Sequence, residues 1–180
     1  NKACCVPVAP QSFGWSPRRD KITMPAMESH ADQVIVRRAE IGDVATLCSM
    51  LGLLFGQETD FHPDPEKQER GLRMILEQPE VGQIFCAENT DGIVGMASIL
   101  FSVSTAEGGR VAWLEDMIVH PDWRGAGVGK RLLRQAITAA QDAGCKRITL
   151  LTDLTNENAM KFYAQAGFVR SGMIPFRLRL

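Results

Sequence analysis

The sequence predicts one α/β (α+β) domain with a mixed, mostly antiparallel central sheet flanked by helices. Three apolar, alternating segments follow one another between residues 82 and 120 with short turns between them, as expected of an antiparallel meander. A strand, a helix and another strand then succeed each other between residues 108 and 152, which requires at least one parallel pair. A chain of 180 residues is long enough to bury the core of one such domain.

The first part of the domain is predicted to be a strand followed by two helices. Residues 33–39 alternate and contain β-branched side chains, and residues 40–58 place apolar side chains at helical spacing. The second helix is expected to begin near Pro65 and to end before Pro79. The three strands of the meander are expected at residues 82–88, 93–105 and 108–120.

The C-terminal part is predicted to alternate between helices and strands. A helix from about residue 127 to residue 143 has one apolar face. Residues 146–152 are apolar enough to predict a strand that is buried on both faces. A short helix is expected over residues 156–166, and one or two strands over residues 168–180 follow it.

Residues 1–32 differ from the rest of the chain. They are rich in Pro, Ser and short polar residues, show no periodicity, and lack the apolar core of a secretory signal peptide. We therefore expect a flexible N-terminal leader over residues 1–32 and a single domain over residues 33–180.

Composition and charge argue against several classes of partner. The formal net charge of −1 argues against an obligatory nucleic-acid partner, because phosphate binding needs a basic surface. No apolar run approaches the ~18 residues of a membrane span, so no membrane partner is expected. The five cysteines match no zinc-binding spacing, so we expect no metal, and their odd number favours free thiols in a cytoplasmic protein.

The segment RGAGVGK indicates an anion site at the start of a helix. Gly125, Gly127 and Gly129 alternate, and Arg124 and Lys130 flank them. Glycines let backbone N–H groups approach a ligand closely, and a helix N-terminus offers unpaired N–H donors with a partial positive charge. Phosphate groups are the usual ligands of such sites. The alternative is a tight turn that only begins the helix.

Two other phosphate-binding patterns do not fit this segment. A P-loop needs G-x-x-x-x-G-K-[ST], but Arg131 follows Gly129 and Lys130, and Arg124 stands where the first glycine belongs. A dinucleotide-binding fingerprint needs a third glycine where the chain has Lys130. Asp153 imitates the ribose-binding acid of that fingerprint, but too few residues follow it to complete a six-stranded sheet. The pattern therefore disfavours a nicotinamide-dependent enzyme.

Two motifs of the chain resemble those of one enzyme family. Arg124-x-x-Gly127-x-Gly129 resembles the [RQ]-x-x-G-x-[GA] signature of the GNAT superfamily of N-acetyltransferases. NENAMKFYAQAGF, residues 156–168, resembles the family's C-terminal N-x-x-A-x-x-x-Y-x-x-x-G-F motif, and the two motifs occur in the family's order and separation. The predicted GNAT-like sheet agrees with this, although residues 40–80 match the family only by their helical pattern.

The resemblance implies acetyl-CoA as co-substrate. In the family, backbone N–H groups of the glycine loop bind the pyrophosphate and the preceding strand pairs with the pantetheine arm. One N–H polarises the thioester carbonyl, as in an oxyanion hole. Asn156 matches an asparagine that contacts the coenzyme, although Asn is also a favoured N-cap. The positions carried over as coenzyme contacts are Met117, Ile118, Val119, Arg124, Gly125, Ala126, Gly127, Val128, Gly129, Lys130 and Asn156.

Tyr163 and Glu115 are the candidate catalytic residues. The resemblance places Tyr163, the only tyrosine of the chain, near the coenzyme sulfur as proton donor, and the alternative is a core aromatic residue. Glu115 lies in mid-strand, where a carboxylate is costly unless it faces a cleft. It matches a family glutamate that relays the acceptor's proton, with amine binding as the alternative role and His120 as a rival base. Strand alternation predicts that Glu115 and Asp116 point to opposite faces of the sheet.

The resemblance implies transfer of an acetyl group to a primary amine. Direct attack in a ternary complex is expected, since no cysteine lies in either motif. Phe55, Phe61 and His62 lie in the segment that covers the acceptor site in the family, so they are candidate substrate contacts, with a core role as the alternative. Acidic residues in this segment suit a cationic amine, and a small-molecule amine is favoured over a protein amine. Many family members form homodimers. A non-catalytic acyl-CoA-binding module of the same fold is the alternative function.

Overall fold

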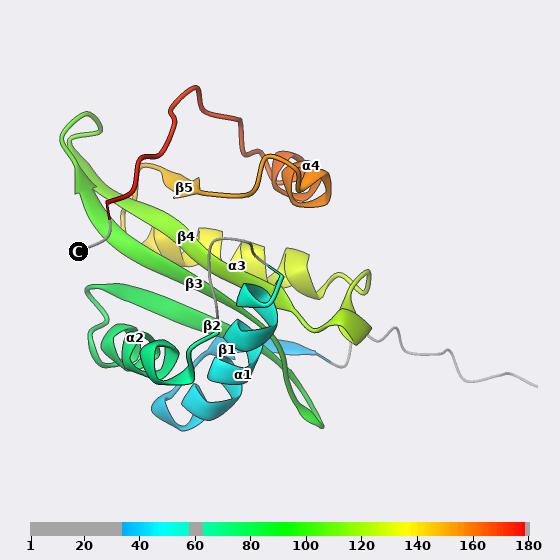
Figure 1. Cartoon of the computed structure of the whole chain (residues 1–180). Coiled ribbons are helices and arrows are strands. Elements are labelled where there is room, and N and C mark those ends of the chain that lie inside the picture. Colours follow the sequence, from blue (N-terminus) through cyan, green and yellow to red (C-terminus); the bar gives the residue numbers. More distant parts are fainter. Residues whose placement is uncertain (1–33, 58–62, 179–180) are drawn as a thin grey trace, which may run out of the picture.

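The computed structural model describes residues 34–57 and 63–178 of the chain. Within these residues, five strands form one sheet in the order β1-β2-β3-β4-β5 (Figure 1). The strands are β1 (Ile35–Arg38), β2 (Gly82–Asn89), β3 (Gly92–Ser104), β4 (Gly109–Val119) and β5 (Ile148–Leu150). The first four are antiparallel and β5 runs parallel to β4, which confirms the predicted mixed, mostly antiparallel sheet.

Helices cover both faces of the sheet (Figure 1). Their bounds confirm the helices predicted from the sequence: α1 (Val44–Phe55), α2 (Pro65–Glu77), α3 (Val128–Asp142) and α4 (Glu157–Gln165), with two 3-10 turns, η1 (Ile41–Asp43) and η2 (Pro121–Trp123). α1 and α2 pack on one face, here called the α1 face, and α3 packs on the opposite one, the α3 face. None of the described helices is long and apolar enough to cross a membrane.

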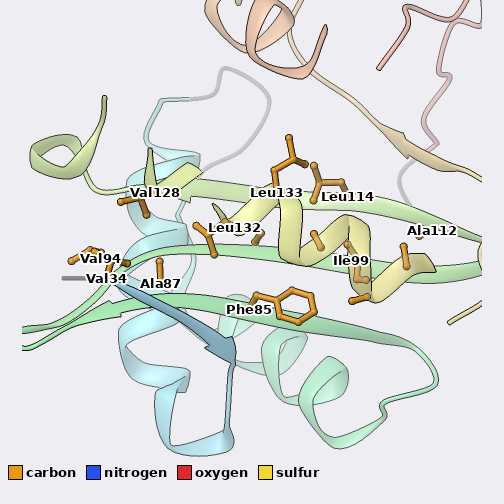
Figure 2. Packing of buried hydrophobic residues seen from close by; sticks show 14 residues of the cluster. Val34, Phe85, Ala87, Val94, Ile99, Ala112, Leu114, Val128, Leu132 and Leu133 are labelled. Carbon is orange, nitrogen blue, oxygen red and sulfur yellow. The ribbon is translucent and has the colours of Figure 1, made fainter. Parts of the chain in front are cut away.

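The core on the α3 face holds the start of α3 against the sheet. Leu132 of α3 is fully buried, and Phe85 of β2 is 1% exposed within the same cluster (Figure 2). Burial of such a side chain contributes about 1.5–3 kcal/mol. Val128, the first residue of α3, belongs to this cluster and is also 1% exposed. The glycine segment before α3 is therefore anchored at its C-terminal end by apolar packing.

β4 contains a β-bulge at its centre. In the register with β3, Glu115 and Asp116 together lie opposite the single residue Ser98. Leu114 and Met117, on either side of the bulge, both pack on the α3 face. Strand alternation is therefore broken, and Glu115 and Asp116 both lie on the α1 face. The prediction that these two carboxylates point to opposite faces is wrong, because it assumed a regular strand.

β5 is shorter and more exposed than the sequence predicts. Only Ile148–Leu150 forms the strand, opposite Ala112–Leu114 of β4, instead of residues 146–152. Its side chains are half-buried rather than buried on both faces, because within the described residues β5 is the edge of the sheet. β4 therefore runs on to Val119 beyond its last pair with β5.

The segment after α4 forms no strand over residues 168–178, although the sequence predicts one or two strands there. β5 offers an edge of only three residues, and Pro175 has no N–H to donate to a strand ladder. Without a partner strand, the apolar side chains of this segment stay exposed. These are Val169, Met173, Ile174, Phe176 and Leu178.

Candidate active site

The first turn of α3 is open to a ligand. Gly127 is the N-cap with φ +83° and Gly125 has φ +78°, both in the left-handed region that favours glycine, while Ala126 between them is half-buried. The first turn of α3 has neither a side-chain cap nor an acidic residue. By contrast, Asp64 caps α2 and Asn156 caps α4. The N–H groups at the start of α3 are therefore oriented for an anion.

Val128 and Gly129 face the protein rather than a ligand. Val128 is buried in the core on the α3 face. A Cβ atom on Gly129 would lie 3.6 Å from the Phe162 ring and 3.7 Å from Met117 Cε, so α3, α4 and β4 converge at this point. These two residues can serve the predicted anion site only through their backbone N–H groups.

Arg124 connects the glycine segment to two other parts of the fold. Its Nε donates a hydrogen bond to the backbone carbonyl of Val119 at the end of β4, at 3.1 Å. Its Nη2 donates to Oε1 of Gln57, just beyond α1, also at 3.1 Å. No local sequence pattern points to Gln57, because 67 residues separate it from Arg124. The guanidinium thus braces the loop as well as adding positive charge to it.

β4 parts from β5 before the chain reaches the glycine segment. Met117, Ile118 and Val119 pair with β3 on one side, but β5 pairs with β4 only as far as Leu114. The Ile118 side chain is buried on the α1 face, so this residue has only its backbone to offer. An extended ligand can pair with such a strand edge through main-chain hydrogen bonds.

Tyr163 reaches β4 from α4. Its hydroxyl donates a weak hydrogen bond to Met117 Sδ at 3.8 Å. The ring makes edge contacts with Phe162 and Phe168, whose centroids lie 5.2 Å and 5.8 Å away. Burial raises the pKa of the Tyr163 phenol above its ordinary value, so the hydroxyl keeps its proton at neutral pH. The structure therefore places a neutral proton donor next to the predicted coenzyme-binding strand.

Asn156 and His120 have structural roles in helix capping. The Asn156 side chain accepts a hydrogen bond from the Ala159 backbone N–H at 3.0 Å, which shows the N-cap role. Nδ1 of His120 accepts a hydrogen bond from the Asp122 N–H at 3.4 Å at the start of η2. Coenzyme contact by Asn156 stays a prediction beside its capping role.

The candidate substrate contacts fall in and after α1. Phe55 is the last residue of α1, is half-buried and packs against the core on the α1 face. This position fits the core alternative, and substrate contact by Phe55 stays a prediction. Phe61 and His62 lie outside the described residues.

Glu115 and Asp116 differ in their surroundings although they share the α1 face. The Glu115 side chain is exposed, whereas Asp116 is half-buried. Ser98 Oγ donates to Asp116 Oδ2 at 2.9 Å, and the Asp116 backbone N–H donates to Ser98 Oγ at 3.1 Å. Burial raises the pKa of Asp116 from an ordinary value of 3.8 to about 6, while the Ser98 hydrogen bond lowers it and the charge of Glu115 raises it. The sequence pattern named Asp116 only as the neighbour of Glu115, and it did not point to Ser98.

Asp116 is expected to make the stability of the protein depend on pH. Because its pKa is higher in the folded protein, the stability it contributes is full below about pH 4 and is lost as the pH rises through about 6. The free energy of unfolding of wild type should therefore fall relative to that of Asp116→Asn by ~2–3 kcal/mol across this window. Urea unfolding at several pH values measures the difference.

The matched control for this prediction is Asp142→Asn, which removes the same charge from an exposed position at the end of α3. The difference between wild type and this variant gives the baseline for removing one exposed carboxylate. Parallel behaviour of the two variants would contradict the prediction.

A groove of about 520 Å³ lies between α3 and α4. Lys130 and Arg134 stand one helical turn apart on its wall. The groove therefore presents two cations close to the open start of α3. Arg134 was not predicted, because the sequence pattern points only to the glycine segment and its flanks. The lining residues are Lys130, Leu133, Arg134, Ile137, Thr138, Gln141, Phe162, Gln165 and Ala166.

The described residues bring most of the predicted coenzyme contacts together at one end of β4. They contain no group of three or more His, Cys, Asp or Glu side chains that could hold a metal ion. The chemistry that this arrangement can carry out rests on backbone N–H groups, one phenol and two carboxylates. Such groups can bind an anion and move protons.

Known proteins are similar to this chain both in sequence and in fold. A family model described as acetyltransferase (GNAT) family matches residues 48–168. The chain is 36% identical over 89 residues to glucosamine 6-phosphate N-acetyltransferase of Trypanosoma brucei brucei, covering 49% of this chain and 58% of that protein. It is 31% identical over 136 residues to an uncharacterized N-acetyltransferase of Bacillus subtilis, covering 74% of this chain and 88% of that protein.

Among solved structures, an integron cassette protein from a Cole Harbour salt marsh metagenome superimposes with a TM-score of 0.72 at 27% identity. The superposition covers 83% of this chain and 91% of that one. The chain spans little more than half the length of the trypanosomal relative. The family model, however, covers well over half of the present chain, and the chain therefore belongs to the GNAT acetyltransferase family.

Proposed function

We propose that the protein is an acetyl-CoA-dependent N-acetyltransferase that moves an acetyl group to a primary amine by direct attack in a ternary complex. The observation that carries this proposal is the parting of β4 from β5 after Leu114, in the strand that leads through η2 to the uncapped start of α3. Tyr163 reaches the same part of β4 through Met117. Family membership and the names of the relatives support the same activity.

The residues present fit both the pyrophosphate and the pantetheine arm of the coenzyme. Backbone N–H groups from Gly125 to Lys130 would hold the pyrophosphate, because they point out of an uncapped helix. The backbone of Met117 to Val119 would pair with the pantetheine arm along the parted edge of β4. When bound, the coenzyme supplies an acetyl thioester, which is the acetyl donor.

Two side chains would handle the protons. A protonated amine cannot attack, so Glu115 would accept one proton from the ammonium group on the α1 face of β4. Tyr163 would give its hydroxyl proton to the departing thiolate, because burial raises its pKa and keeps that proton in place until it is needed. These roles divide the acid and the base between two elements, α4 and β4.

The thiols support direct attack rather than a covalent acetyl-cysteine. Cys48, Cys86 and Cys145 are free. Burial raises the pKa of all three thiols, to about 11 for Cys86, so they stay protonated and poorly nucleophilic at neutral pH. Free thiols also support the cytoplasmic location that we propose.

We propose a small-molecule primary amine as acceptor. The exposed carboxylate of Glu115 on the α1 face supports a cationic amine, which it would attract. The trypanosomal relative is named for an amino sugar phosphate, which supports a small molecule over a protein amine. A homodimer stays a prediction.

Calorimetric titration of acetyl-CoA tests the proposal. Wild type should bind with micromolar affinity, and Gly127→Glu should bind about 100-fold more weakly, because a carboxylate at the N-cap repels the pyrophosphate. Gly108→Glu is the matched control, since Gly108 also has a positive φ and open space around it but lies in the turn between β3 and β4. Both variants carry a similar backbone strain.

Three outcomes are informative. Equal binding by the two variants, or no binding by wild type, would overturn the coenzyme site. Binding by wild type without turnover of any amine in a broad panel would favour the non-catalytic acyl-CoA-binding module. Turnover with release of free thiol would establish the transferase.

A further inference from the structure

Asp116 is a titratable group that the mechanism above leaves without a role. A regular strand would point it to the α3 face, into the core around Leu114 and Met117. The bulge instead turns it to the α1 face, beside Glu115 and opposite Ser98. The bulge therefore places two successive carboxylates on one face of β4, next to the backbone positions assigned to the coenzyme.

Ser98 holds Asp116 at two points. The Ser98 hydroxyl donates to the carboxylate at 2.9 Å and accepts from the backbone N–H of the same residue at 3.1 Å. Ser98 is fully buried, and a buried hydroxyl is costly unless it is hydrogen-bonded. These two bonds define both the position of the Asp116 side chain and the local shape of the bulge.

Few charged side chains other than Glu115 surround Asp116. β3 and β5 carry no charged side chain, and α1, which packs on this face, carries only Cys48 as a titratable group. α2, the other helix of the α1 face, carries charged side chains but packs on β2. Within the described residues, Glu115 is the charged neighbour that acts on Asp116. Like charges on one face of a strand repel each other, and the charge of Glu115 accordingly raises the pKa of Asp116.

We propose that Asp116 is a positioning residue for acetyl transfer: clamped by Ser98, its negative charge acts through Glu115 and strengthens that carboxylate as the proton acceptor for the amine. This inference rests on the proposed function. In the step concerned, an N–H bond of the ammonium breaks and its electron pair stays on nitrogen. The proton forms an O–H bond on Glu115, and Asp116 keeps its charge. The competing role for Asp116 is purely structural, as a link between β3 and β4.

The dependence of kcat/KM on pH separates the two roles. In wild type, kcat/KM should fall on the acidic side with a midpoint near 6, where Asp116 takes up a proton. Asp116→Asn preserves the shape of the side chain and its ability to accept from Ser98. Asp116→Asn should abolish the fall of kcat/KM at acidic pH and should lower kcat by about 10-fold, with little change in KM.

Variants of Ser98 and Glu115 complete the test. Ser98→Ala removes the hydroxyl that favours the charged carboxylate, so the midpoint should move to higher pH, and Ser98→Thr should bring it back. Glu115→Gln should lower kcat by about 100-fold or more, a larger loss than in Asp116→Asn, because it removes the acceptor itself. Acetyl-CoA binding, measured by calorimetry, checks that each variant is folded.

Two results would count against the inference in different ways. Normal turnover by Asp116→Asn with an unchanged acidic limb would overturn the positioning role and leave Asp116 as a link between strands. Absence of turnover by wild type with every amine would overturn the proposed function, and the inference with it.

Discussion

Replacing Tyr163 with phenylalanine is expected to lower kcat by about 100-fold or more, because removal of a positioned general acid typically costs 10²–10⁴ in rate. The ring remains to make its edge contacts with Phe162 and Phe168, so the fold and the binding of acetyl-CoA should change little. Steady-state release of free thiol gives kcat and KM, and calorimetry gives the coenzyme affinity. The loss should appear in kcat and not in that affinity.

A conservative change next to Tyr163 provides the control. Phe168→Leu replaces one of the rings that contact Tyr163 with a smaller aliphatic side chain but keeps the phenol. It should lower kcat much less than Tyr163→Phe does. A decrease of less than about 3-fold in Tyr163→Phe would instead make this residue an aromatic packing residue without a role in proton transfer.

Replacing Phe85 with alanine is expected to lower the free energy of unfolding by about 3–5 kcal/mol. Phe85 is 1% exposed in the core on the α3 face (Figure 2), so alanine would leave a cavity beneath α3. Urea unfolding, followed by circular dichroism, measures the change. Because this layer also anchors Val128, we expect weaker acetyl-CoA binding at temperatures where the variant is partly unfolded.

The same substitution at an exposed phenylalanine separates burial from residue type. Phe176 is 96% exposed after α4, and Phe176→Ala should change the free energy of unfolding by no more than about 0.5 kcal/mol. Similar losses in the two variants would mean that Phe176 is covered in solution, or that Phe85 contributes less to the core than its burial indicates.

The elements that the sequence predicts well are those whose signals are local. Pro65 at the start of α2, Gly127 before α3 and Gly144 after it mark helix ends through the conformation of a few neighbouring residues. Helical spacing of apolar residues and the short turn at Asp91 and Gly92 act over similar distances.

The elements that it predicts poorly depend on partners elsewhere in the chain. Residues 146–152 and 168–178 have strand-like composition, but a strand exists only where an edge can pair with it. β5 pairs over three residues, and the segment after α4 finds no strand partner within the described residues. The composition of a segment does not predict how many residues of a neighbouring edge strand are available to pair with it.

The sequence by itself determined the order of helices and strands, the glycine-rich start of α3 and the family resemblance, because each depends on residues close together in the chain. Only the tertiary structure decided that Glu115 and Asp116 share a face, since the bulge forms against Ser98 on another strand. The same holds for the contact of Tyr163 with Met117, across 46 residues. Packing sets such long-range contacts, and no short sequence pattern encodes them.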